Sequence, residues 1–160
     1  MINIIAAVAR NRAIGYQNKL LYWLPNDMRR FRKLTTGNTV IMGRRTFESL
    51  PNGPLPNRRN VVLTHSNLTI PGVDICGSFD EVIFSTMPDE TLFIIGGANI
   101  YSQSMHLADR LLLTEVEDIP AQADAFFPDY SEWKLISKEW HPADERHAFA
   151  YSFTEYEKGD

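Results

Sequence analysis

Four short, almost unbroken apolar runs recur along this chain, and the stretches between them leave room for helices. The runs are residues 1–9, 39–42, 60–63 and 92–95. Apolar runs of this length, without polar alternation, are typical of strands buried on both faces of a parallel sheet. Strands that alternate with helices predict an α/β fold.

Caps, glycine stops and spacing place the remaining elements. The expected helices are 26–35, 44–50, one that begins after Ser78, and 98 to about 107. The further expected strands are a short one ending at Ile75, 111–116, and an alternating pair at 133–140 and 149–156. Residues 10–22 are expected to form a loop with Gly15 and Asn18 as turn residues. The terminal pair would add an antiparallel edge and make the sheet mixed.

Composition limits the class of protein. A chain of 160 residues is long enough for one domain, 1–160, with a sizeable core. Its net charge of −4 is poor for binding nucleic acid. The single Cys76 fits a reducing cytoplasm. The first apolar run is too short for a signal peptide or a membrane helix, and no other run is longer, so no membrane partner is expected.

One carboxylate, Asp27, stands at the start of an expected helix between apolar residues. Pro25 suits the first helical position, and an anion in the first turn complements the helix dipole. Two interpretations stay open. Asp27 either only charges the helix start, or it lies in an apolar pocket and holds a cationic or amide-like ligand. In the second case burial would raise the pKa of Asp27.

Two junctions, 40–46 and 93–101, place glycine between a buried strand and a helix start. Glycine lets a ligand approach the backbone, and the helix N-terminus attracts phosphate. Arg44 and Arg45 add forked cationic donors. The glycines could instead only make tight turns. The pattern is not the G-x-G-x-x-G fingerprint, so a nucleotide would bind in another way.

Other chemistries have weaker support. Arg58 could hold a carboxylate with two parallel hydrogen bonds, or be a solvated loop residue. The four histidines are scattered without an H-E-x-x-H motif, so no metal site is expected. There is no G-x-S-x-G motif and no P-loop.

Taken in order, these pieces resemble bacterial dihydrofolate reductase from end to end. The matching segments are Ala6-Ala7, Ile14-Gly15, Leu24-Pro25-Asn26-Asp27, 40–49, 54–58, 95–101 and Phe127-Pro128. The resemblance implies a mixed, mainly parallel eight-stranded central sheet flanked by four helices. It implies reduction of 7,8-dihydrofolate to 5,6,7,8-tetrahydrofolate with NADPH, by hydride transfer to C6 and protonation of N5, which supplies one-carbon and thymidylate metabolism. It also implies binding of antifolate inhibitors and a cytoplasmic monomer.

The resemblance also implies residue roles. The implied catalytic residues are Asp27, Tyr22 and Leu20. The implied substrate-binding residues are Ile5, Ala7, Asp27, Met28, Phe31, Arg58, Ile95 and Thr114. The implied cofactor-binding residues are Ala7, Ile14, Gly43, Arg44, Arg45, Thr46, Leu63, Thr64, His65, Gly96, Gly97, Ala98, Asn99, Ile100, Tyr101 and Gln103. A cis peptide bond is implied between Gly96 and Gly97.

The chain departs from the family at several positions. Tyr22 stands where the family commonly has Trp, and Trp23 follows it. The segment that we expect to contact the lid loop, residues 9–23, carries Ala123 and Ala125 on either side of Asp124. We expect Asp124 to form a hydrogen bond with this lid. Two other functions compete: the reductase domain of riboflavin synthesis, which lacks the carboxylate at Asp27, and a non-catalytic nucleotide- or pterin-binding protein.

Overall fold

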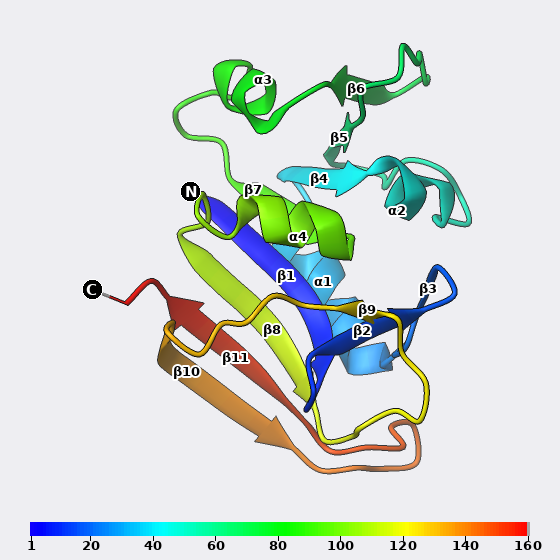
Figure 1. Cartoon of the computed structure of the whole chain (residues 1–160), viewed down its shortest axis with the longest axis vertical. Helices are drawn as coiled ribbons and strands as arrows, with labels where there is room; N and C mark the ends of the chain where they lie inside the picture. The colour runs from blue at the N-terminus through cyan, green and yellow to red at the C-terminus, as the bar shows by residue number, and fades with distance from the viewer. Residues whose placement is uncertain (160) are drawn as a thin grey trace.

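The computed structural model describes residues 1–159 and contains one large central sheet (Figure 1). Its strands are β1 (Ile2–Ala9), β4 (Thr39–Gly43), β5 (Arg59–Leu63), β6 (Val73–Cys76), β7 (Leu92–Gly96), β8 (Arg110–Val116), β10 (Lys134–His141) and β11 (Tyr151–Glu157). Their order is β10-β11-β8-β1-β7-β4-β5-β6. β11 pairs antiparallel with β8 and β10, and every other neighbouring pair is parallel. The expected mixed, mainly parallel sheet is confirmed.

Within residues 1–159 the sheet is flanked by four helices, α1 (Pro25–Thr35), α2 (Arg44–Glu48), α3 (Phe79–Phe84) and α4 (Ala98–Ser104). Alternate side chains of each strand point to opposite faces. The face that contains Ile5 packs against Phe31 of α1, and the face that contains Ile4 packs against Tyr101 of α4. Figure 1 shows α4 in front of the sheet and α1 behind it. The site residues carried by α1 therefore belong to one face.

Two helices end earlier than the sequence predicted. α4 stops at Ser104, whose hydroxyl donates to the carbonyl oxygen of Ile100 at 2.8 Å. After α2, the hydroxyl of Ser49 donates to the carbonyl oxygen of Thr46 at 2.6 Å. Serine side chains compete for helix carbonyls in this way and favour ends over interiors. The spacing of apolar residues, from which the helix ends were predicted, contains no information about these serine hydrogen bonds.

Two strands of a second sheet lie in the region 10–22 that the sequence predicted as a loop. This sheet comprises β2 (Ala13–Tyr16), β3 (Lys19–Leu20) and β9 (Ala125–Phe126), in the order β3-β2-β9. Asn18 lies in the turn, with a φ of 63°, but Gly15 lies in β2. A Cβ on Gly15 would stand 3.1 Å from the carbonyl oxygen of Lys19, so glycine permits close pairing. The prediction failed because these strands are very short and pair with a distant segment.

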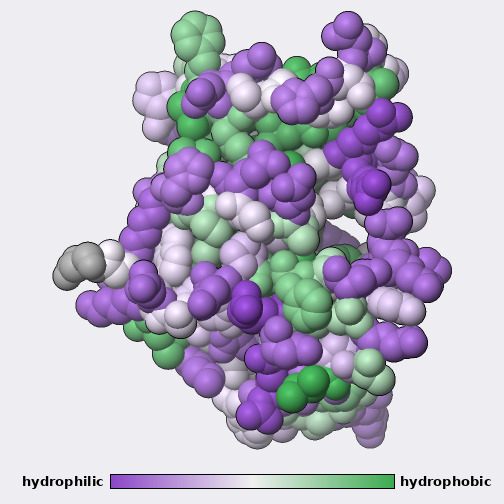
Figure 2. All heavy atoms as spheres, in the orientation of Figure 1, coloured by the Kyte–Doolittle hydropathy of each residue, from purple (hydrophilic) through white to green (hydrophobic). Residues whose placement is uncertain are grey.

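The carboxyl ends of β4 and β7 meet at one edge of the sheet, where Met42 pairs with Gly96. In open α/β sheets, ligands bind beyond the carboxyl ends of the strands. Figure 2 shows the surface hollowed at this edge, between the part that carries α2 and the β2–β3 hairpin.

Among residues 1–159, no helix combines the length and the apolar composition that a membrane crossing requires.

Candidate active site

Asp27 lies in the first turn of α1, and Pro25 is the first residue of that helix, as the sequence predicted. Oδ1 of Asp27 accepts a hydrogen bond of 2.5 Å from the hydroxyl of Thr114 on β8. Thr114 is in turn the register partner of Ala7 on β1. Ile5 is two positions before Ala7 and therefore lies on the same face of the sheet. The carboxylate thus reaches the sheet face that α1 covers.

Apolar side chains surround this position. Phe31 and Ile95 pack with Ile5 in the cluster between α1 and the sheet. Met28 is 39% exposed and stands at the rim. Burial raises the pKa of Asp27, although the hydrogen bond from Thr114 and the charge of Arg30 act in the opposite direction. The direction agrees with the expected rise in the pKa of Asp27, and its largest cause is desolvation by burial.

The start of α1 is fixed by a contact that the sequence analysis missed. Nε2 of His147 accepts a hydrogen bond of 3.2 Å from the backbone N–H of Asn26. Nδ1 of the same ring lies 2.8 Å from Asp144, which assigns the proton to Nδ1. His147 is buried, and the side chain of Asn26 donates to the hydroxyl of Tyr151 at 2.7 Å. No local pattern links His147 to this helix, because the two are far apart in the chain.

Arg58 is held near the other end of α1. Its Nη1 donates to the hydroxyl of Thr35 at 3.0 Å, and its Nε donates to the carbonyl oxygen of Pro56 at 2.9 Å. Burial, followed by the positive charge of Arg32, lowers the pKa of Arg58. The guanidinium carries five N–H donors, so a fixed fork remains for an anion.

The two glycine junctions lie side by side at the carboxyl edge. Gly43 precedes α2 and Gly97 precedes α4, and neither helix start receives a side-chain cap. By contrast, Ser78 caps α3 by accepting from the backbone N–H of Glu81 at 3.2 Å. The first N–H groups of α2 and α4 therefore lack the partner that α3 has.

The backbone conformation at the second junction favours glycine. Gly96 has a φ of 134°, and a Cβ there would lie 3.4 Å from the hydroxyl oxygens of Thr46 and Tyr101. The Gly96–Gly97 peptide bond is cis, as the resemblance implied. The expected residues Ala98, Asn99 and Ile100 follow in the first turn of α4. Because glycine has no side chain, a ligand can approach the backbone here more closely than it could at any other residue type.

Arg44, at the first position of α2, reaches the loop after β5. Its Nε donates to Glu48 at 2.8 Å and its Nη1 to the hydroxyl of Ser66 at 3.5 Å. The hydroxyl of Thr64 accepts from the backbone N–H of Ser66 at 3.2 Å. Ser66 therefore lies with Arg44 and Thr64, two of the expected cofactor-binding residues. In the sequence, only its position two residues after Thr64 could have indicated this. Arg45 and His65 are exposed at the same edge.

Three other expected cofactor residues take different positions. Leu63 ends β5, is buried, and pairs with Gly43. The hydroxyl of Tyr101 is buried and donates to the carbonyl oxygen of Ile5 at 2.8 Å. Gln103 is exposed, and its side chain donates to Asn99 in the first turn of α4 at 3.1 Å.

The lid residues divide into two groups. Ile14 is buried on β2, whereas Leu20 on β3 is 58% exposed. Asp124 accepts from the backbone N–H of Gln17 at 3.0 Å, which confirms the expected bond to the lid. The hydroxyl of Tyr22, an expected catalytic residue, donates to Asp118 at 2.8 Å. The phenol is drawn to this carboxylate, and its ring packs edge-on against Phe149.

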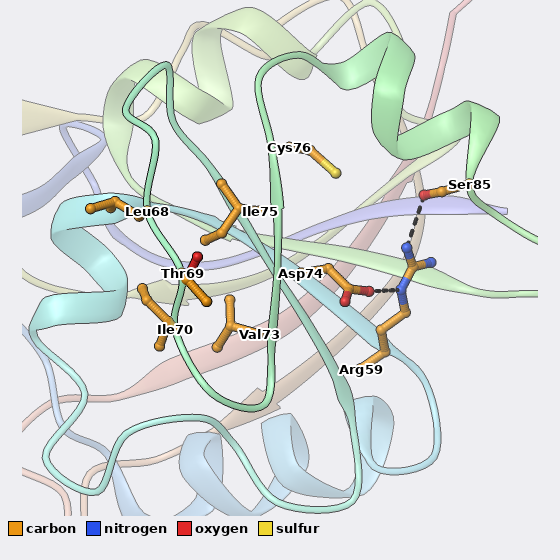
Figure 3. A pocket seen from close by; sticks show the side chains of 9 residues that line it. All are labelled: Arg59, Leu68, Thr69, Ile70, Val73, Asp74, Ile75, Cys76 and Ser85. Atoms are coloured by element: carbon orange, nitrogen blue, oxygen red, sulfur yellow. Dashed lines mark hydrogen bonds and ion pairs between the residues drawn. The ribbon is translucent and has the colours of Figure 1, made fainter.

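A separate cavity of about 470 Å³ lies along β5 and β6 (Figure 3). Arg59 in its wall donates to Asp74 and to Ser85, both at 2.8 Å. None of the expected substrate or cofactor residues lines it. In the part of the chain that the structure describes, no three His, Cys, Asp or Glu residues gather as a metal ion would need.

Residues 1–158 match the family model described as dihydrofolate reductase. A dihydrofolate reductase of Bacillus subtilis (strain 168) is 40% identical over 99% of this chain and 95% of that protein. A type 3 dihydrofolate reductase of Salmonella typhimurium is 40% identical over 96% and 95%, respectively. A structure of the Enterococcus faecalis dihydrofolate reductase, complexed with NADP(H) and RAB-propyl, has a TM-score of 0.90 and 30% identity, covering 100% of this chain and 97% of that chain. The chain shares its fold with the Enterococcus faecalis enzyme and matches the family model along nearly its full length. The chain therefore belongs to the dihydrofolate reductase family.

Proposed function

We propose that this protein reduces 7,8-dihydrofolate to 5,6,7,8-tetrahydrofolate with NADPH, by hydride transfer to C6 and protonation of N5. The observation that carries this proposal is the half-buried carboxylate of Asp27, bonded to Thr114 on the sheet face that α1 covers. A buried carboxylate is stable only when donors satisfy it, and paired N–H groups suit both of its oxygens. A pterin offers such a pair at N3 and the 2-amino group.

Asp27 then has two tasks. Its ionised form accepts from N3 and the 2-amino group, which fixes the orientation of the ring against the sheet. Because Thr114 donates to Oδ1, the remaining capacity of the carboxylate is directed at the ligand. Its raised pKa brings its proton exchange closer to neutral pH than that of an ordinary carboxyl group, which promotes protonation of N5 through water.

The neighbouring residues position the rest of the substrate. Ile5, Ala7 and Ile95 form the floor on the sheet, and Phe31 with Met28 forms the wall on α1. Arg58 holds the α-carboxylate of the glutamate tail with the donors that Thr35 and Pro56 leave available.

The carboxyl edge fits NADPH. The N-termini of α2 and α4 lack side-chain caps, and Gly96 and Gly97 leave space beside Thr46. We assign the pyrophosphate to these N–H groups with Arg45 and Thr46, and the 2′-phosphate to Arg44, Thr64 and His65. When bound, NADPH supplies the hydride. Ala7, Ile14 and Tyr101 orient the nicotinamide, and Leu20 covers it to exclude water.

Several wider features belong to the same proposal. The product would supply one-carbon and thymidylate metabolism, and antifolate inhibitors would compete at the Asp27 pocket. We expect a cytoplasmic monomer in which 1–160 forms one domain. We assign Tyr22, whose hydroxyl is engaged by Asp118, to the support of the lid rather than to contact with the reacting atoms.

A steady-state assay tests the proposal. Oxidation of NADPH, followed by the near-ultraviolet absorbance of the reduced nicotinamide, should require dihydrofolate. Tight binding of both ligands without turnover would indicate a non-catalytic binding protein. Turnover of a riboflavin precursor in place of dihydrofolate would indicate the other reductase.

A further inference from the structure

Asp27 and Arg30 lie one helical turn apart on α1, and both reach the same register position of the sheet. Asp27 accepts from Thr114 on β8. The guanidinium carbon of Arg30 lies 4.6 Å from the centre of the Phe153 ring on β11. Thr114 and Phe153 are direct cross-strand partners. Residues three apart on a helix share a face, so the charged ends of Asp27 and Arg30 are neighbours above one strand pair.

The charge of Arg30 is not cancelled by a direct partner. Nη1 of Arg30 is buried and has no hydrogen-bond partner among residues 1–159. Among the same residues, Arg30 forms none of the ion pairs of the structure. An arginine remains charged in proteins, and stacking on an aromatic ring holds it without neutralising it. Its positive charge therefore acts on the nearby, half-buried carboxylate of Asp27.

Other charged groups also face this pair. Glu155 on β11 and Glu139 on β10 attract Arg30, but Glu155 pairs with Arg110 at 3.7 Å and Glu139 with His141 at 2.7 Å. The ring of His141 packs against Phe153. On the other face of the sheet, burial and then the charge of Asp27 raise the pKa of Tyr101 on α4. Among these groups, Arg30 is the cation on the same helix face as Asp27.

We propose that Arg30 is a positioning residue of the reaction: held on Phe153, it favours the ionised form of Asp27 and thereby sets the pH at which activity declines. This rests on the proposed function. Of the three influences on the pKa of Asp27, burial raises it, whereas the hydrogen bond from Thr114 and the charge of Arg30 lower it. Removal of the cation should therefore move the decline to higher pH.

Three variants separate charge from packing. Arg30→Met removes the charge and keeps an apolar contact with Phe153, and Arg30→Lys keeps the charge. Arg29→Gln removes the same charge from the adjacent, exposed position of α1 and serves as the matched control. Above the parent midpoint, Arg30→Met should retain about two- to fivefold more of its plateau kcat/KM, as a partly screened charge pair allows. Arg30→Lys should restore the parent profile, and Arg29→Gln should leave it unchanged.

A direct titration makes the outcome independent of activity. The Asp27 carboxyl carbon, labelled with ¹³C and assigned by its absence in Asp27→Asn, should titrate at higher pH in ligand-free Arg30→Met than in the parent. Arg30→Gln provides a second neutral variant should Met fail to pack. An unchanged titration, or an equal shift in Arg29→Gln, would overturn the proposal. Absence of dihydrofolate turnover in the parent would instead overturn the proposed function, while the titration would still test Arg30.

Discussion

The substrate side and the cofactor side of the proposed site differ in how far they are assembled without a ligand. On the substrate side, Asp27 is half-buried and bonded to Thr114, and Arg58 is held by Thr35. On the cofactor side, the side chain of Arg44 is 48% exposed and paired with Glu48, which is 60% exposed. One side is a fixed template, whereas the other must exchange its partners when a phosphate arrives.

The two sides therefore differ in the stage at which the free-energy cost of holding a charged group arises. The substrate side carries the cost in the folded protein, because burial disfavours the charge of Asp27. The cofactor side carries it at binding, because Arg44 must leave Glu48 before it can hold a phosphate. Mutations on the substrate side should therefore have large effects on kcat/KM for dihydrofolate, and those on the cofactor side smaller effects on the affinity and selectivity for the cofactor.

The largest effect is expected at Asp27. Asp27→Asn keeps the shape and removes the charge, so kcat/KM at neutral pH should fall by roughly 10²–10⁴-fold, the usual range for acid–base assistance. In the parent, kcat/KM should decline as pH rises through the raised pKa of Asp27. In the variant that step should vanish, and activity should partly recover in acid. A pH profile of kcat/KM measures all three.

The same variant tests the cost of the fixed template. Because the folded protein holds the proton of Asp27 more tightly than the unfolded chain does, ionised Asp27 lowers stability above its folded pKa, and this loss disappears as pH falls. At neutral pH, Asp27→Asn should raise Tm in thermal unfolding. Near-parent activity would contradict the catalytic role, and unfolding would restore the interpretation of Asp27 as only a helix-start charge.

The next effect is expected at Arg58. Arg58→Leu should raise the KM for dihydrofolate at least tenfold, since a charged hydrogen bond contributes about 1.5–3 kcal/mol. A dihydropterin without the glutamate tail should show little change, which makes it the matched substrate control. Equal losses with both substrates would mean that Arg58 supports α1 through Thr35 rather than holding the tail.

A smaller effect is expected at Arg44. Charge-assisted bonds to the 2′-phosphate should give the parent a preference of about tenfold or more for NADPH over NADH. Arg44→Ala should reduce this ratio of kcat/KM values, while Arg29→Gln, the same charge change elsewhere, should not. Equal kcat/KM values for NADPH and NADH in the parent would contradict the assignment of Arg44 to the 2′-phosphate.

The smallest effect is expected at Glu48. Glu48→Gln releases Arg44 from an exposed i,i+4 ion pair, which stabilises a helix by about 0.3–0.5 kcal/mol. The Kd of NADPH should therefore fall by about twofold, and the KM of dihydrofolate should stay unchanged. A rise in the Kd of NADPH would show that Glu48 orients Arg44 instead of competing for it.

Local chemistry explains which parts could be predicted from the sequence. The helix at Asp27 follows from Pro25 beside it, and both glycine junctions follow from apolar runs that stop at glycine. Thr114 was reached only through the family resemblance, because its bond to Asp27 joins positions 87 residues apart.

The remaining features depend on tertiary contacts. His147 bonds to Asn26 across 121 residues, and nothing beside it in the sequence marks a helix partner. The β2–β3–β9 sheet escaped prediction for the same reason, since its two- and four-residue strands are stabilised by each other rather than by their own pattern. Arg30 reads as an ordinary helix-surface cation until β11 places Phe153 beneath it.

The contact between His147 and α1 has a consequence for synthesis on the ribosome. A chain emerges from its N-terminus, so α1 leaves the ribosome long before its partner His147 and before β11, which carries Phe153. During that interval the N–H of Asn26 lacks its acceptor, and Asp27 faces a sheet that still lacks an inner strand. Helix α1 is thus among the first elements to be made and among the last to have all of its tertiary contacts.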